Sequence, residues 1–152
     1  MCGIIVSDLS IPRTAYKFIE KRGPDNTNEV RYNDIIFVHF LLHLTGEKRI
    51  QPIIDNNIAC IFNGEIYNYK EIFAEAKSDV DSILHIYKEK GVKGLRDLDG
   101  EFVIVLFDFN RNEIIISSDI FHTKPLFYNL NENIVISSYE RAGQMIKKNT
   151  YT

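Results

Sequence analysis

The chain has 152 residues, 45% of them hydrophobic and 26% charged, a composition typical of one globular domain. Its net charge of −3 gives no broad electrostatic reason to bind nucleic acid or a membrane surface. Because no apolar run approaches the ~20 residues of a membrane span and no signal sequence precedes the first strand, we expect a cytoplasmic protein.

The first half of the chain alternates strands and helices. The second of two paired strands is apolar nearly throughout, so we expect both of its faces to be covered. Ser78 and Asp79 both suit the N-cap of a helix that Gly91 ends. The apolar spacing predicts strands at 2–6, 29–32, 35–44 and 58–62, a turn at 23–26, and helices at 11–21, 67–76 and 80–90.

The final third is rich in strands. It predicts two hairpins, with strands at 101–109 and 113–118 and at 126–128 and 133–137, and a closing helix at 138–148. Two sets of strands with helices to cover each favour an α+β fold. The periodicity does not reveal the order of the layers.

The two cysteines differ in context. Cys60 lies in the apolar run 58–62, where we expect a buried and inert thiol. Cys2 follows the initiator Met1, and removal of Met1 would place a thiol and a free α-amine on one residue. Such a residue is a nucleophile that carries its own general base. Cysteine at position two alone is weak evidence, since it can be an unremarkable residue. The four histidines are scattered, so we expect no metal site. We also expect no cofactor.

Several short segments, taken in order, resemble the glutaminase domain of class II glutamine amidotransferases, and most closely that of asparagine synthetases. The segments span nearly the whole chain and their joint order makes the resemblance strong. They are Met1-Cys-Gly-Ile4, Arg22-Gly-Pro-Asp25, Gln51-Pro52, Asn63-Gly-Glu-Ile-Tyr-Asn68, Ser78-Asp79, Leu98-Asp-Gly-Glu-Phe102, Leu106-Phe-Asp108 and Lys124-Pro-Leu-Phe-Tyr128.

The resemblance implies an N-terminal nucleophile hydrolase fold, a four-layer α-β-β-α sandwich of two antiparallel sheets. It implies a single amidotransferase domain at 2–148, followed by a short polar tail at 149–152. It also implies hydrolysis of the side-chain amide of L-glutamine to glutamate and ammonia through a thioester on Cys2. Since an extended backbone nitrogen has no basic lone pair, activity would depend on removal of Met1.

The matching motif positions imply the roles of further residues. Asn63 and Gly64 would stabilise the oxyanion, the first through its side-chain amide and the second through its backbone N–H. The competing interpretation of this pair is a tight turn. Asp79, with Glu65 beside it, would bind the substrate ammonium, although Asp79 can also be a plain helix cap. Arg22 and Lys124 match supporting positions.

Two departures from the family pattern affect substrate binding. The family's carboxylate-binding arginine is replaced by Leu41, and Arg49 or His43 could take over from the following loop. His122 stands where the family usually has glycine.

The sequence contains no Ser-Gly-Gly-type phosphate loop, so we expect no synthetase domain on this chain. Three functions remain open. The chain is a glutaminase that passes ammonia to a separate ATP-using synthetase, a catalytically weak binding or regulatory module, or a stand-alone amide hydrolase of altered substrate.

Overall fold

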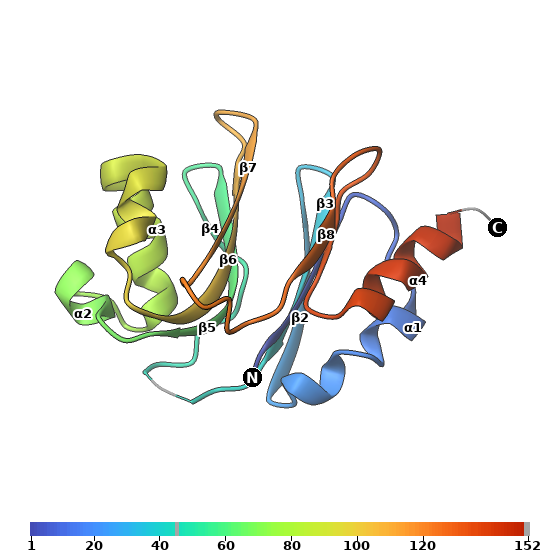
Figure 1. Cartoon of the computed structure of the whole chain (residues 1–152), viewed down its shortest axis with the longest axis horizontal. Helices are drawn as coiled ribbons and strands as arrows, with labels where there is room; N and C mark the ends of the chain where they lie inside the picture. The colour runs from blue at the N-terminus through green and yellow to red at the C-terminus, as the bar shows by residue number, and fades with distance from the viewer. Residues whose placement is uncertain (45, 151–152) are drawn as a thin grey trace. The chain divides into compact units, whose positions relative to one another are not determined.

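The computed structural model describes residues 1–44 and 46–150, with side chains up to residue 148. The contacts divide the chain into two compact units, the first made of Met1–His43 and Pro125–Thr152 and the second of Leu44–Lys124. Each unit contains one antiparallel sheet and its own helices (Figure 1). None of the described helices is long and apolar enough to cross a membrane.

The first unit is built on a five-stranded sheet with the order β2-β3-β1-β9-β8. Its strands are β1 (Gly3–Ser7), β2 (Asn26–Tyr32), β3 (Ile35–Leu41), β8 (Phe127–Asn129) and β9 (Val135–Ser137). Its helices are α1 (Arg13–Tyr16), the 3-10 helix η1 (Glu20–Arg22) and α4 (Glu140–Thr150). The outer strands β2 and β8 form the two edges of this sheet.

One face of this sheet packs against α1 and α4. The shared core contains Ile5, Val38, Ile19 and Ile146. Gly3 is needed for this packing, because a Cβ on Gly3 would lie 2.0 Å from a methyl group of Ile19. The apolar strand β3 is buried along its whole length, as its sequence predicted.

The second unit is built on a four-stranded sheet with the order β4-β5-β6-β7. Its strands are β4 (Ile53–Asp55), β5 (Ile58–Ile66), β6 (Gly100–Asp108) and β7 (Glu113–Ser118). Helices α2 (Tyr69–Ile72) and α3 (Asp79–Lys90) and the 3-10 helix η2 (Gly91–Asp97) connect β5 to β6. A core that includes Phe62, Ile83, Leu95 and Ile104 joins α3 and η2 to one face of the sheet.

Helix α3 has well-defined ends. Ser78 is its N-cap, and the Asp81 carboxylate accepts the backbone N–H of Ser78 at 3.1 Å. Gly91 ends the helix with a φ of 65°, and a Cβ there would meet no atom within 4 Å. The predicted cap at Ser78 and the predicted stop at Gly91 are therefore confirmed.

The α+β class with two antiparallel sheets is confirmed, as are both predicted hairpins. Two predicted helices are wrong in extent. Residues 11–21 form only α1 and η1, because the chain leaves helical geometry at Ile19, where φ is −121°. Residues 67–76 form only α2, because Phe73 is extended. The expected tail at 149–152 begins as the end of α4, and its last two residues lie outside the described part.

Candidate active site

Cys2 lies in the first unit, directly before β1, and is half-buried. The backbone N–H of Leu42 donates to its Sγ at 3.3 Å, and Sγ lies 3.5 Å from the carbonyl oxygen of Leu42. Leu42 follows the end of β3, so the strand predicted to reach residue 44 stops at Leu41. The thiol is therefore held by the backbone just beyond β3, a contact that the sequence did not predict.

The Arg22–Asp25 turn contacts Cys2, the position at which the sequence predicted it to act as a support. Arg22 Nε donates to the carbonyl oxygen of Cys2 at 3.2 Å. Gly23 lies against β3, since a Cβ on it would lie 2.1 Å from the Phe40 carbonyl oxygen. The Asp25 carboxylate accepts the backbone N–H of His43 at 2.8 Å. Arg22 thus positions the start of the chain, and Asp25 positions the segment that follows β3.

Asn63 and Gly64 lie inside β5 in the second unit, opposite Val103 and Phe102 of β6. The tight-turn interpretation of this pair is therefore wrong. Gly64 has a φ of 142°, and a Cβ on it would lie 2.0 Å from the carbonyl oxygen of Glu101. Glycine at this position is required because the backbone of β6 approaches closely.

The backbone N–H of Gly64 points to the outer edge of β5. Phe102 lies opposite Gly64 in β6, but its N–H donates to the Asp119 carboxylate and its carbonyl oxygen accepts the Asp119 N–H. Neither backbone group of Phe102 therefore points toward Gly64. On the outer edge, where the pairing with β4 has ended, Phe62 N–H donates to Gln51 Oε1 at 2.8 Å. Since N–H groups alternate along a strand, that of Gly64 has the same direction. Gln51, to which the sequence assigned no role, thus holds the strand next to Asn63.

The side chain of Asn63 is buried, with an exposed fraction of 1%. It lies on the face of β5 opposite to Phe62, because side chains alternate along a strand. Within the part of the chain that the structure describes, neither its amide nitrogen nor its amide oxygen has a hydrogen-bond partner. Leaving such a buried polar atom unpaired costs about 1–3 kcal/mol. A donor kept at this cost fits a ligand that supplies the missing oxygen.

Asp79 is the first residue of α3 and is 9% exposed. Its carboxylate accepts the backbone N–H of Ile66 at 3.1 Å and the hydroxyl of Ser78 at 3.1 Å. Burial, and to a lesser degree the charge of nearby Glu65, raises the pKa of Asp79 to about 6, against these hydrogen bonds. Asp79 and Glu65 together therefore form an anionic site beside the end of β5.

The residues considered for the substrate carboxylate have different surroundings. Leu41 is buried in β3, and His43 is exposed beyond it. Arg49 Nη2 forms an ion pair with Asp81 at 2.8 Å. Arg49 Nε is buried and, among the described residues, has no hydrogen-bond partner. His122 adopts a φ of 51°, a left-handed conformation that glycine reaches most easily. This conformation agrees with the glycine that the family usually has at this position.

The second unit thus brings Asn63, Gly64, Glu65 and Asp79 together around β5 and the start of α3. Cys2 and its supporting turn belong to the first unit. Cys60 is fully buried, as predicted, and burial strongly raises the pKa of its thiol, which disfavours the reactive thiolate.

Comparison with known proteins identifies the family of the chain. The sequence model of the glutamine amidotransferase domain family matches residues 1–150. Asparagine synthetase [glutamine-hydrolyzing] 2 of Bacillus subtilis is 39% identical over 91% of this chain and 21% of its own length. Putative asparagine synthetase [glutamine-hydrolyzing] 1 of Methanocaldococcus jannaschii is 30% identical over 83% of this chain and 29% of its own length. This chain therefore spans less than a third of these relatives.

Solved structures show the same fold at low sequence identity. The allosteric regulatory enzyme of purine biosynthesis matches 95% of this chain and 37% of its own, with a TM-score of 0.60 and 14% identity. Glutamine phosphoribosylpyrophosphate amidotransferase from Bacillus subtilis matches 74% of this chain and 29% of its own, with a TM-score of 0.58 and 19% identity. These likenesses show that the chain has the fold of these proteins, the N-terminal nucleophile hydrolase fold. The chain belongs to the glutamine amidotransferase domain family, in class II.

Proposed function

We propose that this chain hydrolyses the side-chain amide of L-glutamine to glutamate and ammonia, with Cys2 as nucleophile. Removal of Met1 frees the α-amine of Cys2, which takes the thiol proton as Sγ attacks the amide carbon. The carbon–nitrogen bond breaks, ammonia leaves with that proton, and water then cleaves the thioester to glutamate. The family match and the Leu42 N–H that contacts Sγ support this role.

The observation that carries this proposal is the buried amide of Asn63, which no described residue pairs, beside the outward N–H of Gly64. Two such donors are what a tetrahedral oxyanion needs, and loss of one typically costs about 3–4 kcal/mol of barrier. The mechanism requires both donors to act on the same carbonyl as Cys2.

The α-ammonium of glutamine needs an anionic partner, for which we propose Asp79 with Glu65. An ammonium ion beside Asp79 would favour the charged form that burial disfavours. For the α-carboxylate we propose Arg49 Nε, with Asp81 holding the guanidinium in place.

A second candidate function is hydrolysis of a different amide. Leu41, at the position of the family's carboxylate-binding arginine, is 6% exposed and offers no hydrogen-bond donor from its side chain. A substrate without an α-carboxylate would suit this position better than glutamine does.

We further propose that the ammonia passes to a separate asparagine-synthetase-like chain. The support is the similarity to proteins named asparagine synthetases, which are much longer than this chain. Ammonia transfer is tested by adding a purified synthetase that lacks its own glutaminase and measuring asparagine formed from glutamine.

Labelling with a diazoketone analogue of glutamine tests the nucleophile. The intact mass is measured first to establish that Met1 has been lost. We expect one label per chain, on Cys2, that is blocked by glutamine and absent in Cys2→Ala. Cys60→Ala is the matched control and should label like the unmodified chain.

The other outcomes assign the other functions. Labelling that glutamine does not block, together with release of ammonia from other amides, would favour the altered substrate. No labelling of a chain shown to begin at Cys2 would favour a catalytically weak binding module. Rapid ammonia release by a chain that retains Met1 would contradict the proposed general base.

A further inference from the structure

The edge strand β8 differs from the other edge strands of the described structure. The unpaired backbone N–H and carbonyl groups of an edge strand can form hydrogen bonds with another chain, and charged side chains on the edge often prevent this. The edge strand β2 carries Glu29 and Arg31, β4 carries Asp55, and β7 carries Glu113. The three residues of β8, Phe-Tyr-Asn, carry no charge.

The backbone of Tyr128 is directed to the open side of β8. The Ser138 N–H donates to the Ile4 carbonyl oxygen, and the Asp8 N–H donates to the Ile134 carbonyl oxygen. Hydrogen-bonded pairs recur at every second residue, so Ile136, between these two, also directs its backbone groups toward β1. The backbone N–H and carbonyl groups of Val135 and Ser137 therefore point toward β8, where these residues pair with Asn129 and Phe127. The N–H and carbonyl of Tyr128, between these two pairs, point away from β9.

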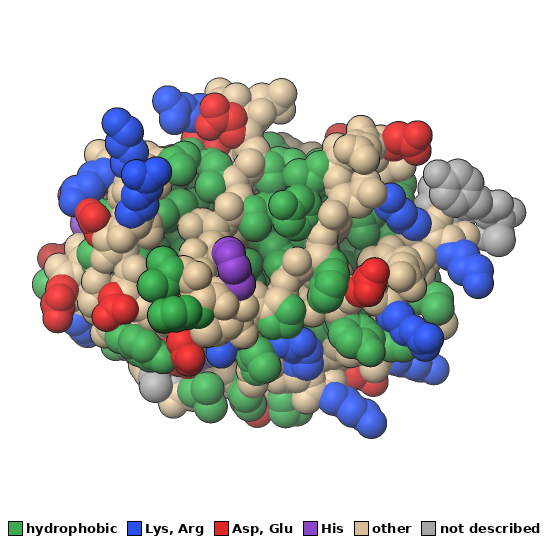
Figure 2. All heavy atoms as spheres, in the orientation of Figure 1, with side chains coloured by type: hydrophobic (Ala, Val, Ile, Leu, Met, Phe, Trp, Pro, Cys, Tyr) green, Lys and Arg blue, Asp and Glu red, His purple; other side chains and the backbone are tan. Residues whose placement is uncertain are grey.

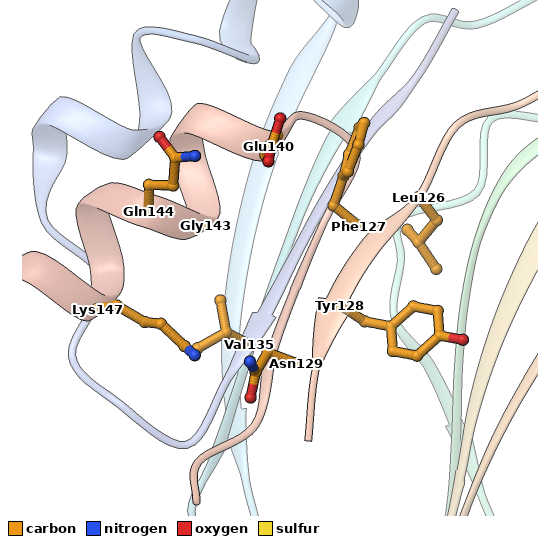
Figure 3. Close-up of a pocket in the computed structure, with 9 residues that line it drawn as sticks. All are labelled: Leu126, Phe127, Tyr128, Asn129, Val135, Glu140, Gly143, Gln144 and Lys147. Atoms are coloured by element: carbon orange, nitrogen blue, oxygen red, sulfur yellow. The ribbon is translucent and has the colours of Figure 1, made fainter. Parts of the chain in front are cut away.

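The surface along this edge is apolar. Phe127 is 43% exposed, Tyr128 61% and Leu130 40%. A pocket of about 390 Å³ lies between β8 and α4, and its lining includes Phe127 and Val135 (Figure 3). Tyr128 points to the side away from α4.

The side of α4 that lines this pocket has a charge at each end. Glu140, Gly143, Gln144 and Lys147 are spaced to lie along one side of the helix. Lys147 extends back toward the sheet in Figure 3, and Figure 2 shows both acidic and basic side chains over α4. The buried side of the helix, at Ala142 and Ile146, faces the core instead.

We propose that β8 and this side of α4 form the interface with a second copy of the chain. Two β8 strands would pair antiparallel about a twofold axis through Tyr128, whose N–H and carbonyl groups would exchange two hydrogen bonds between the copies. The two five-stranded sheets would then form one continuous sheet. Tyr128 would lie opposite Tyr128 on one face, and Phe127 opposite Asn129 on the other.

Charge complementarity supports a second copy as the occupant. A twofold axis normal to the sheet places the two α4 helices antiparallel on the same face. With strands about 4.8 Å apart, helices that lie over β9 and β8 come within roughly 10–14 Å of each other. Glu140 of each copy then faces Lys147 of the other, across the small Gly143.

Tyr128→Pro tests the strand pairing. Proline removes the outward N–H but none of the bonds to β9, which come from Phe127 and Asn129. Sedimentation velocity over about a hundredfold range of concentration should show a dimer for the unmodified chain. We expect the variant to raise the dimer dissociation constant at least about tenfold. Tyr128→Phe keeps the backbone and should leave the constant unchanged.

Charge reversal tests the helix contact with no backbone change. Glu140→Lys and Lys147→Glu each place like charges opposite one another twice, and each variant should dimerise about tenfold more weakly. A mixture of the two variants restores opposite charges in both positions. We therefore expect the mixture to form heterodimers as tightly as the unmodified chain dimerises.

Three results would overturn the proposal. The first is a chain that stays monomeric at every concentration. The second is a dimer that Tyr128→Pro and both charge reversals leave unchanged, which would place its interface elsewhere. The third is a monomeric chain that binds a separate synthetase in a Tyr128-dependent way, which would assign the edge to that partner.

Discussion

Two buried aspartates of the second unit, Asp119 and Asp79, are held in opposite ways. Asp119 accepts the hydroxyl of Thr123 at 2.6 Å and the backbone N–H groups of Phe121 and Phe102 at 2.9 and 3.0 Å. Burial by itself would raise the pKa of Asp119, but these hydrogen bonds outweigh it and lower the pKa. Asp79 accepts fewer hydrogen bonds and lies near Glu65, and its pKa rises to about 6.

The difference separates a structural carboxylate from one available to a ligand. The Asp119 carboxylate accepts hydrogen bonds from the loop after β7 and from β6, so its charge stabilises the fold. The charge of Asp79 costs on the order of 3 kcal/mol at neutral pH, as judged from its pKa rise. A carboxylate held at such a cost is suited to bind a cation, and the ammonium of glutamine is our proposed one.

The largest expected effect is on stability, in Asp119→Ala. The variant leaves the backbone N–H groups of Phe102 and Phe121 without their acceptor, so we expect the free energy of unfolding to fall by about 3 kcal/mol or more. Urea unfolding followed by circular dichroism measures the change. The exposed Asp99→Ala is the control, with an expected change within about 0.5 kcal/mol. A loss below about 1 kcal/mol in Asp119→Ala would contradict the structural role.

The next effect is on glutamine binding, in Asp79→Asn. The amide keeps an acceptor for the Ile66 N–H but removes the charge, so KM for glutamine should rise about ten- to a hundredfold. The same change should raise the free energy of unfolding by up to about 3 kcal/mol, because it removes a buried charge. Steady-state kinetics and urea unfolding of the same preparation check both. An unchanged KM would remove Asp79 from the substrate site.

The sequence predicted the strand before Asp119 better than the strand that ends beside Asp79. The strand at 113–118 was predicted with its observed bounds, because alternation and a turn define it locally. The end of β5 was not, since its apolar run stops at Phe62 while the strand continues to Ile66. Residues 63–66 extend the strand through pairing with β6, which is distant in sequence.

The motif match predicted Asn63, Gly64 and Asp79 as site residues but did not predict what surrounds them. The Gly64 N–H points outward because the N–H and carbonyl groups of Phe102, opposite it, are hydrogen-bonded to Asp119. The partner of Arg49, which is Asp81, depends on how the loop before β4 meets α3. Both are tertiary contacts between residues distant in sequence, and local patterns do not contain them.

The pH dependence distinguishes Asp79 from Asp119 by sign. The pKa of Asp79 is raised in the folded state, so its contribution to stability is present below about pH 4 and is lost as the pH rises through about 6. The stability advantage of Asp79→Asn should therefore shrink as the pH falls from about 7 to about 4. Asp119, whose pKa is lowered, contributes stability above about pH 4 that is lost on further acidification.

Glutamine binding gives a second readout of the same titration. If the ammonium requires ionised Asp79, KM should rise about tenfold per pH unit below about pH 6. Glu65→Gln removes a neighbouring charge that raises this pKa, so the midpoint should move to lower pH. A KM that is constant between about pH 7 and about pH 4 would contradict the requirement.

The smallest expected effect concerns Arg49. One hydrogen bond from its Nε to the substrate carboxylate would contribute about 0.5–1.5 kcal/mol, so Arg49→Gln should raise KM about two- to tenfold. Loss of the ion pair with Asp81, in which Arg49 is 38% exposed, should lower the free energy of unfolding by no more than about 1 kcal/mol. Asp81→Asn breaks the same ion pair but keeps the guanidinium, so KM should change less. Its stability should fall at least as much, because the Asp81 carboxylate also accepts the Ser78 N–H at the start of α3. If both variants leave KM unchanged, Arg49 is only structural and does not replace the arginine lost at Leu41. His43 is then the remaining candidate for the carboxylate, and the case for an amide substrate other than glutamine is stronger.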